Sequence, residues 1–341
     1  MKRTEISELG EFGLIEHLAK KITINSPHTL IGIGDDAAVL DARGKKILVS
    51  TDLLVEGVHF DLTYTPLKHL GYKAAVVNFS DMAAMNVLPV QITVSIAISS
   101  RFSLEAVDAF YEGILLACGR YNVDLVGGDT TSSTSGMMIS VTVIGYAEEA
   151  DIVYRSGAKE DDLVCVSGDL GAAYAGLLLL EREKTVFEAH PEIQPDLDGH
   201  DYVLERQLKP EARTDVVLVL KEKGIKPTSM MDISDGLASE ILHICKESKV
   251  GALLYPEKIP VDPQAAGLAD TFKMTPLTLA LNGGEDYELL FTISQKDYEI
   301  VKDIEGISII GHICDEASGV HLVSSDSSLL PITAQGWDSF K

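Results

Sequence analysis

Residues 91–98 of the chain read QITVSIAI, and residues 103–121 read SLEAVDAFYEGILLACGRY. The first run is short and rich in β-branched residues, which predicts a buried strand. In the second run, apolar residues recur at the spacing of one helix face, namely at Leu104, Val107, Phe110 and Ile114. Ser103 precedes this stripe, and because its hydroxyl can accept a hydrogen bond from an amide of the first turn, we expect the helix to begin there.

The same alternation of strand and helix continues along the chain. Further strands are expected at residues 46–51, 137–146, 163–166, 229–233 and 287–292, and further helices at residues 67–85, 170–180 and 236–248. Residues 188–201 combine prolines, a glycine and acids without periodicity, which indicates a surface loop. This rhythm predicts an α/β (α+β) chain with two domains, residues 1–149 and residues 150–341.

The balance of charges argues against several classes of partner. The chain has 28 basic and 52 acidic residues, and its net charge of -24 repels nucleic acids and anionic membrane surfaces. The charged N-terminus lacks the apolar core of a signal peptide, and no apolar run is long enough to span a bilayer. We therefore expect a cytoplasmic protein without a nucleic-acid or membrane partner.

The cysteines give no sign of a metal or disulfide framework. Cys118, Cys165, Cys245 and Cys314 lie far apart, and no two of them form a C-x-x-C pair. Reduced and mostly buried thiols are therefore expected.

Aspartates recur at the ends of apolar runs, where α/β folds place ligand sites. They are Asp35, Asp36, Asp52, Asp81, Asp129, Asp232 and Asp235. Several have glycine or hydroxyl neighbours, which lets a phosphate approach the backbone and adds oxygen ligands that suit Mg²⁺. Each aspartate alone could instead cap a helix or close a turn. As a set they would repel one another, and shared metal ions are one physical solution.

The common nucleotide-binding motifs are absent from the sequence. No G-x-x-x-x-G-K-[ST] stretch occurs, and neither H-R-D nor D-F-G is found. Gly32-Ile33-Gly34 lacks the third glycine of a dinucleotide fingerprint and leads into two acids that would repel a pyrophosphate without a metal. The usual kinase folds and an NAD site are therefore not expected.

Eight phrases taken together resemble the thiamine-monophosphate kinase family, and they occur in the order found there. They are Gly32-Ile33-Gly34-Asp35-Asp36-Ala37, Ser50-Thr51-Asp52, Val58-His59-Phe60, Asn78-Phe79-Ser80-Asp81-Met82-Ala83-Ala84-Met85, Gly127-Gly128-Asp129-Thr130-Thr131, Arg155-Ser156-Gly157-Ala158, Asp232-Ile233-Ser234-Asp235-Gly236-Leu237 and Asn282-Gly283-Gly284-Glu285-Asp286-Tyr287-Glu288. The opening residues 10–15 and the closing residues 336–340 are also similar, so the resemblance covers nearly the whole chain.

The resemblance implies a fold and an assembly. The family belongs to a larger group of ATP-binding proteins that includes aminoimidazole-ribotide synthetase, selenophosphate synthetase and a hydrogenase maturation factor. In that group the N-terminal domains of two chains pair, and their strands form a barrel. A homodimer with ATP near the subunit interface is therefore expected from the resemblance.

The resemblance also implies roles for individual residues. It assigns magnesium ions to Asp36, Ser50, Thr51, Asp52, Asp81, Asp129, Asp232 and Asp235, with Asp52, Asp81 and Asp129 closest to the chemistry. It assigns ATP to Gly128, Asp129, Arg155 and Ser234, and thiamine phosphate to His59, Glu285 and Trp337. Without the resemblance, His59 would be interpreted as a structural histidine, Arg155 as a surface ion-pair partner and Trp337 as a core aromatic.

The implied reaction moves the terminal phosphate of ATP directly to the phosphate of thiamine monophosphate and gives thiamine diphosphate and ADP. Several Mg²⁺ ions would neutralise the charges of the two anions. The alternatives are another ATP-activating enzyme of the same group, of the cyclo-ligase or selenophosphate type, and a non-catalytic nucleotide-binding protein.

Overall fold

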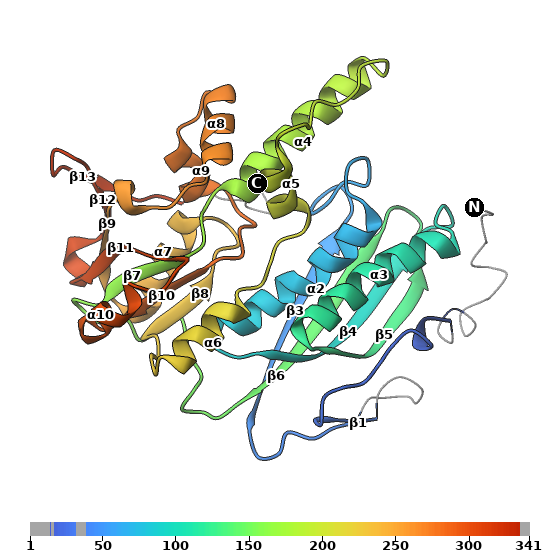
Figure 1. The fold of residues 1–341 in the computed structure, drawn as a ribbon, viewed down its shortest axis with the longest axis horizontal. Coiled ribbons are helices and arrows are strands. Elements are labelled where there is room, and N and C mark those ends of the chain that lie inside the picture. Colours follow the sequence, from blue (N-terminus) through green and yellow to red (C-terminus); the bar gives the residue numbers. More distant parts are fainter. Residues whose placement is uncertain (1–13, 15–16, 32–38, 335–341) are drawn as a thin grey trace. The chain divides into compact units, whose positions relative to one another are not determined.

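The computed structural model describes residues 14, 17–31 and 39–334 of the chain. Two of the expected site residues, Asp36 and Trp337, lie outside the described residues. The chain divides into two compact units (Figure 1). Unit 1 comprises Met1–Met82 and Val87–Ala150, and unit 2 comprises Ala83–Asn86 and Asp151–Lys341.

Unit 1 is built on a four-stranded sheet with the strand order β3-β6-β4-β5. Strands β4 and β5 are parallel, and the other two pairs are antiparallel. The elements are β1 (Thr29–Ile31), β2 (Val39–Leu40), β3 (Lys46–Val55), α2 (Leu67–Ala84), β4 (Pro89–Ile98), α3 (Leu104–Tyr121), β5 (Asp124–Ser132) and β6 (Met138–Ala147). Strands β1 and β2 pair separately as a short antiparallel ladder.

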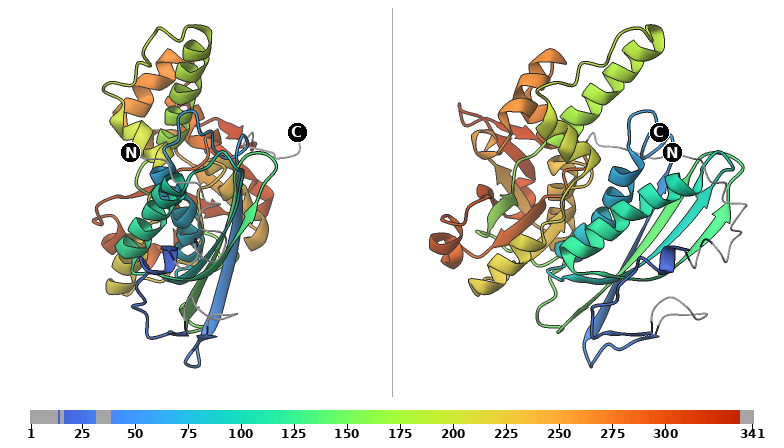
Figure 2. Two further views of the ribbon diagram at one scale, coloured as in Figure 1. Left: turned by 90° about the vertical axis from the view of Figure 1, so that its right-hand side faces the viewer. Right: turned by 45° about the vertical axis from the view of Figure 1, so that its right-hand side comes forward.

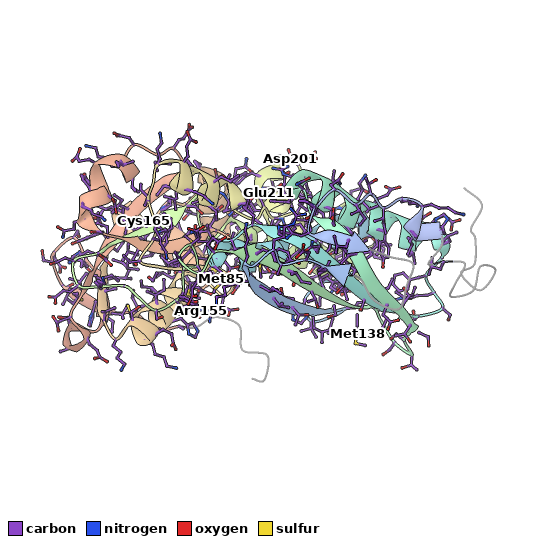
Figure 3. The ribbon with its side chains drawn as sticks, turned by 90° about the horizontal axis from the view of Figure 1, so that it is seen from below. Met85, Met138, Arg155, Cys165, Asp201 and Glu211 are labelled. Atoms are coloured by element: carbon purple, nitrogen blue, oxygen red, sulfur yellow. The ribbon has the colours of Figure 1, made fainter. Side chains whose placement is uncertain are left out.

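The two faces of this sheet differ. Helices α2 and α3 cover one face (Figure 2). Val94 of β4 and Val141 of β6, which are paired across the two strands, are buried. On the opposite face, Val49 and Leu53 of β3 remain exposed, as does Met138 of β6, whose side chain projects away from the sheet in Figure 3. Because side chains alternate along a strand, successive residues of β3 lie in turn on the helix-covered face and on the exposed face of the sheet.

Two glycines allow α2 and α3 to touch backbone to backbone. A Cβ atom added at Gly71 of α2 would lie 2.0 Å from the carbonyl oxygen of Phe110, and one added at Gly113 of α3 would lie 1.9 Å from that of Lys68. Both distances are far below van der Waals contact, so no side chain fits at either position. This crossing fixes the position of α2, the helix that carries Asp81.

Unit 2 is built on a seven-stranded sheet with the order β13-β12-β9-β11-β7-β10-β8, in which only the β12–β9 pair is parallel. Its strands are β7 (Leu163–Ser167), β8 (Ser229–Asp232), β9 (Gly251–Leu254), β10 (Leu289–Ile293), β11 (Ile307–Cys314), β12 (Val320–Val323) and β13 (Leu329–Pro331). Its helices are α4 (Ala172–Ala189), α5 (Asp201–Leu208), α6 (Thr214–Glu222), α7 (Leu237–Ser248), α8 (Pro263–Thr271), α9 (Pro276–Asn282) and α10 (Tyr298–Val301), with single turns at Pro256–Lys258, Gln295–Asp297 and Glu316–Ser318.

The central strands of unit 2 are buried on both faces. In β10, Leu290 packs into the core that contains Ile241 of α7, whereas its neighbours Leu289 and Phe291 pack into the core that contains Leu220 of α6. This explains why residues 287–292 and 163–166 are continuous apolar runs without polar alternation.

The sequence predicts ten of these elements, most of them to within a few residues, but not β1, β2, β5, β9, β11, β12, β13, α5, α6, α8, α9 or α10. Ser103 caps α3 as expected, since its hydroxyl accepts a hydrogen bond from the amide of Ala106. The helix expected at residues 170–180 begins at Ala172 and continues to Ala189, and the strand expected from residue 287 begins at Leu289. Within the described residues all four cysteines are free, and three of them are buried, as predicted.

The expectation that the aspartates lie at strand ends is wrong for three of them. Asp52 lies inside β3, Asp129 lies inside β5, and Asp81 lies in helix α2. The polar residues that seemed to terminate the apolar runs at Asp52 and Asp129 are instead tolerated within strands at the edges of the unit 1 sheet. Asp232 is the last residue of β8, as expected.

We predict that Gly113→Ala destabilises the protein by about 3 kcal/mol or more, because the added methyl group overlaps the backbone of α2. The midpoint of urea unfolding measures this loss. Gly119→Ala in the same helix is the matched control, since no atom lies within 4 Å of its added Cβ. That variant should gain up to about 1 kcal/mol from helix propensity, and equal midpoints for the two variants would contradict the close crossing.

Candidate functional site

In unit 1, two carboxylates and a hydroxyl meet between β3 and α2. Residues Ser50 and Asp52 alternate with the exposed residues of β3 and therefore point toward the helix side of the sheet. The hydroxyl of Ser50 donates a hydrogen bond of 2.5 Å to Oδ2 of Asp81. Three of the expected metal ligands, Ser50, Asp52 and Asp81, are thus brought together.

The electrostatics of this group favour a cation. Burial and, to a smaller extent, the negative charge of Asp81 together raise the pKa of Asp52 to about 6. A hard divalent ion would relieve this repulsion, and Mg²⁺ is commonly held by one or two carboxylates together with water and substrate phosphates. Within the described residues, no three acidic, histidine or cysteine side chains cluster closely enough to form a protein-only metal cage.

A buried amide fixes the backbone of β3 at this point. Asn78 of α2 is fully buried, and its Oδ1 accepts a hydrogen bond of 3.2 Å from the backbone N–H of Asp52. The side-chain amide donates in turn to the carbonyl oxygen of Ala74, one turn earlier in the helix. Asn78 thereby holds Asp52 in register with Asp81, which lies one turn later on the same helix.

The remaining candidates of unit 1 make other contacts. Thr51 faces the opposite side of the sheet, where its hydroxyl donates to the carbonyl oxygen of Val141. Asp129 is exposed and in register with Ser95 of β4, and the hydrogen bond that its carboxylate accepts comes from the amide of Thr130. His59 follows β3 in an exposed turn, and its Nδ1 accepts a hydrogen bond of 3.1 Å from the amide of Val55.

Gly128, the neighbour of Asp129, occupies a position that excludes any side chain. An added Cβ would lie 2.0 Å from the carbonyl oxygen of Val94 on the adjacent strand. Gly128 is exposed at this edge of the sheet, so its backbone is open to a ligand.

In unit 2, two loops that each carry candidate residues lie side by side. The amide of Glu285 donates to the carbonyl oxygen of Ser234 at 2.7 Å, and the amide of Tyr287 donates to that of Ile233 at 2.9 Å. Gly284 makes this approach possible, since an added Cβ would lie 2.3 Å from the Ser234 oxygen. Residues 232–236 and residues 283–288 therefore lie side by side and bring together Ser234, Asp235 and Glu285, whereas Asp232 is buried.

The second of these loops has a strained backbone and is held in place by buried charged side chains. Glu285 and Tyr287 have φ values of 67° and 53°, a conformation that costs non-glycine residues on the order of 1–3 kcal/mol each. Glu288, at the end of the loop, is buried and accepts hydrogen bonds from Arg206 at 2.8 Å, from Arg213 and from the hydroxyl of Ser167.

Asp286 attaches the same loop to helix α4. Its carboxylate accepts hydrogen bonds from the amides of Gly171 and Ala173, at the N-terminus of the helix. Burial raises the pKa of Asp286 to about 7, while Arg206 and the two amides act in the opposite direction. The second half of the loop is therefore attached to α4 through Asp286 and to α5 through Glu288.

Asp235 lies in an acidic environment. Burial raises its pKa, nearby His243 opposes the rise, and the charge of Glu285 adds to it. The amide of Asp235 donates to Oε1 of Glu240, a buried residue whose pKa is raised to about 8, mainly by burial. The first turn of α7 thus supports the loop that carries Ser234 and Asp235.

Arg155 lies beside the edge strand β8. The carbonyl oxygen of the preceding Tyr154 accepts a hydrogen bond from the amide of Met230, and that of Arg155 accepts one from the hydroxyl of Ser248. The side chain of Arg155, labelled in Figure 3, is exposed. A guanidinium that is exposed beside a strand ending in Asp232 is accessible to a phosphate.

Two amide side chains that hold candidate residues were not expected from the sequence. Asn78 lies within a phrase that carries the resemblance, and a polar residue in the apolar stretch one turn before Asp81 is a signal that could have identified it. Gln207 of α5, whose Nε2 donates to Oε2 of Glu285 at 2.7 Å, follows no pattern that would distinguish it from other helix glutamines.

The helices in the described part of the chain do not have the properties of membrane spans. None of its helices is both long enough and apolar enough to cross a bilayer.

Comparisons with known proteins cover both units. Residues 34–147 match the family model described as AIR synthase related protein, N-terminal domain. The chain is 34% identical to the thiamine-monophosphate kinase of Bacillus subtilis (strain 168) over 98% of this chain and 100% of that protein. It is 35% identical to the thiamine-monophosphate kinase of Aquifex aeolicus (strain VF5), over 98% of this chain and 99% of that protein. The solved structure of AaThiL complexed with AMPPCP and TMP is 33% identical, covers 100% of both chains and has a TM-score of 0.76.

We predict that Glu288→Gln destabilises unit 2 by about 3–5 kcal/mol, because it removes the nearest buried counter-charge of both Arg206 and Arg213. Urea unfolding followed by circular dichroism measures the loss. Asp215→Asn is the matched control, since Asp215 also pairs with Arg213 but is 66% exposed. That variant should lose about 1 kcal/mol or less, and similar losses in both variants would show that burial does not decide the strength of these pairs.

Proposed function

Because this chain belongs to the thiamine-monophosphate kinase family, a family of phosphotransferases, we propose that it transfers the terminal phosphate of ATP to thiamine monophosphate and forms thiamine diphosphate and ADP. The observation that carries the proposal is the full-length likeness to AaThiL, a protein solved with AMPPCP and TMP. The expected cytoplasmic location belongs to the same proposal.

Magnesium ions are part of this proposal. The unit 1 group of Ser50, Asp52 and Asp81 supports it, because these oxygen ligands suit Mg²⁺ and a cation would compensate the charge of two neighbouring carboxylates, one of them partly buried. The full proposed ligand set is Asp36, Ser50, Thr51, Asp52, Asp81, Asp129, Asp232 and Asp235. When bound, the ions would neutralise the phosphates of the two substrates and so reduce the repulsion between them.

Roles for the chain's own residues follow from their surroundings. Gly128 and Asp129 would meet ATP at an exposed strand where the backbone can be approached, and Ser234 and the exposed Arg155 would contact its phosphates. For the thiamine phosphate, we assign His59, Glu285 and Trp337. Glu285 supplies a carboxylate that suits the cationic thiazolium ring or the aminopyrimidine.

The transfer is proposed to be direct and in line. The acceptor is a phosphate oxygen whose second pKa is about 6, so it is largely ionised at neutral pH and requires no general base. The residues of both units then act by positioning the two substrates and by compensating charge, which is how most phosphoryl transfer is accelerated. No phosphorylated enzyme forms on this route.

A homodimer through unit 1 is also proposed, with residues 1–149 as the ATP-binding and dimerisation domain and residues 150–341 as the domain that completes the substrate site. The exposed apolar face of β3 supports the pairing, since Ile47, Val49 and Leu53 are each more than half exposed on a strand at the edge of the described sheet. Such a strand is a ready surface for pairing with a second copy, which would extend the sheets into a barrel.

The direct test mixes the purified protein with ATP, Mg²⁺ and thiamine monophosphate and quantifies the products by chromatography. We expect equal amounts of thiamine diphosphate and ADP, with no product when EDTA removes the divalent ions. ADP with free phosphate but without thiamine diphosphate would point to an ATP-activating relative instead, and no turnover of ATP would favour a binding protein.

The same assay, applied to the variant Asp52→Asn, tests the proposed role of Asp52. This change keeps the size of the side chain and removes its charge, so turnover should fall to near zero while urea unfolding stays close to that of the wild type. Substantial activity at saturating Mg²⁺ would exclude a central ligand role for Asp52.

For the assembly, we predict that Val49→Lys converts a dimer into a monomer, because a charge on the apolar face of β3 cannot be buried against a second copy. Light scattering after size-exclusion chromatography measures the mass. Leu116→Lys is the matched control, since Leu116 is 49% exposed on α3, away from the sheet, and should leave the mass unchanged. A wild-type monomer would overturn the proposed dimer.

A further inference from the structure

Gln207 holds the carboxylate that we assign to the substrate. It lies in the last turn of α5, is 5% exposed, and donates a hydrogen bond of 2.7 Å from Nε2 to Oε2 of Glu285. The two residues are 78 positions apart, so the contact is a feature of the tertiary fold and not of the helix alone.

The backbone of Glu285 is fixed as firmly as its side chain. Its φ of 67° is maintained by the hydrogen bond from its amide to the carbonyl oxygen of Ser234. The residues after it are held by the hydrogen bonds of the buried carboxylates of Asp286 and Glu288. With the amide of Glu285 and the residues after it constrained, the Gln207 hydrogen bond orients the Glu285 carboxylate. One oxygen is engaged by the amide, and the orientation of the other follows from it.

The donor is neutral although two arginines are close by in the chain. Arg206, the immediate neighbour of Gln207, directs its guanidinium to Glu288 and to the carbonyl oxygens of Asp169 and Asp286. Arg213 binds Glu288 and Asp215. An arginine on Glu285 would cancel its charge, whereas an amide orients the carboxylate and adds no positive charge.

We propose that Gln207 is a positioning residue that orients the Glu285 carboxylate toward a cationic organic ligand while preserving its negative charge. This inference rests on the proposed function, in which the ligand is the thiazolium or aminopyrimidine end of thiamine monophosphate. Gln207 acts through Glu285 and therefore affects the binding of the acceptor and not that of ATP.

The test compares steady-state kinetics of the full-length wild type, Gln207→Met and Gln207→Ala, with each substrate varied in turn. Methionine nearly matches the volume of glutamine but lacks the donor. We expect the KM for thiamine monophosphate to rise about tenfold, since hydrogen bonds to charged groups are among the stronger ones, while the KM for ATP and kcat stay within about twofold. Glu205→Ala, on the exposed side of the same helix, should change neither constant.

A double-mutant cycle with Glu285→Gln separates positioning from a general structural effect. Glu285→Gln alone should raise the KM for thiamine monophosphate more than that for ATP, and adding Gln207→Met to it should change the KM little further, because the group to be oriented has lost its charge. Independent, multiplicative effects would overturn the inference.

The remaining outcomes are also decisive. An unchanged KM for thiamine monophosphate, or an equal rise for both substrates, overturns the positioning role. If both Gln207 variants fail to fold, Gln207 is required for the fold and the role is withdrawn. A wild-type protein that forms no thiamine diphosphate overturns the proposed function itself, which is a different result from a wild type that is active and insensitive at Gln207.

Discussion

The burial of the Glu288 carboxylate between two guanidinium groups is the constraint on which the organisation of unit 2 depends. A charge with 2% of its side chain exposed persists only when it is paired, and Arg206 and Arg213 supply the pairing from α5 and from the residue before α6. Strand β10 begins directly after Glu288, so the same contact connects two helices to the central sheet. The strained backbone at Glu285 and Tyr287 persists because the residues that follow each of them are anchored in this way.

Much of the fold can be predicted from the sequence because its signals are local. The apolar stripe of α3 and its serine cap, and the continuous apolar runs of β7 and β10, reflect periodicity that any short window contains. Strand β5 has no such signal, since residues 127–131 are two glycines, an aspartate and two threonines. Its existence is decided by pairing with β4, which a window of sequence does not contain. An edge strand of this kind is therefore easily interpreted as a turn when only the local sequence is considered.

The residues of the candidate site also divide into those that local sequence identifies and those that only the tertiary structure reveals. The acidic and glycine-containing phrases identify Ser50, Asp52 and Asp81 in unit 1 and Ser234, Asp235 and Glu285 in unit 2 as residues of interest, and the structure brings each of these groups together. What orients them was not apparent from the phrases. Asn78 and Gln207 act through single hydrogen bonds between distant parts of the chain, and a lone amide in a helix gives no pattern. The short motifs thus contain the candidate residues, and the tertiary structure determines how these residues are oriented.

The close approach of Gly71 and Gly113 to the backbone of the facing helix limits how this chain can diverge. Each glycine faces a main-chain oxygen of the other helix, and every amino acid carries that oxygen, so no compensating substitution on the partner helix can make room for a side chain. A lineage cannot cross this barrier by two successive mutations, as it could for a pair of interlocking side chains. The position of helix α2, with Asn78 and Asp81, is therefore constrained by the backbone of α3 and not by any side chain that a mutation could change.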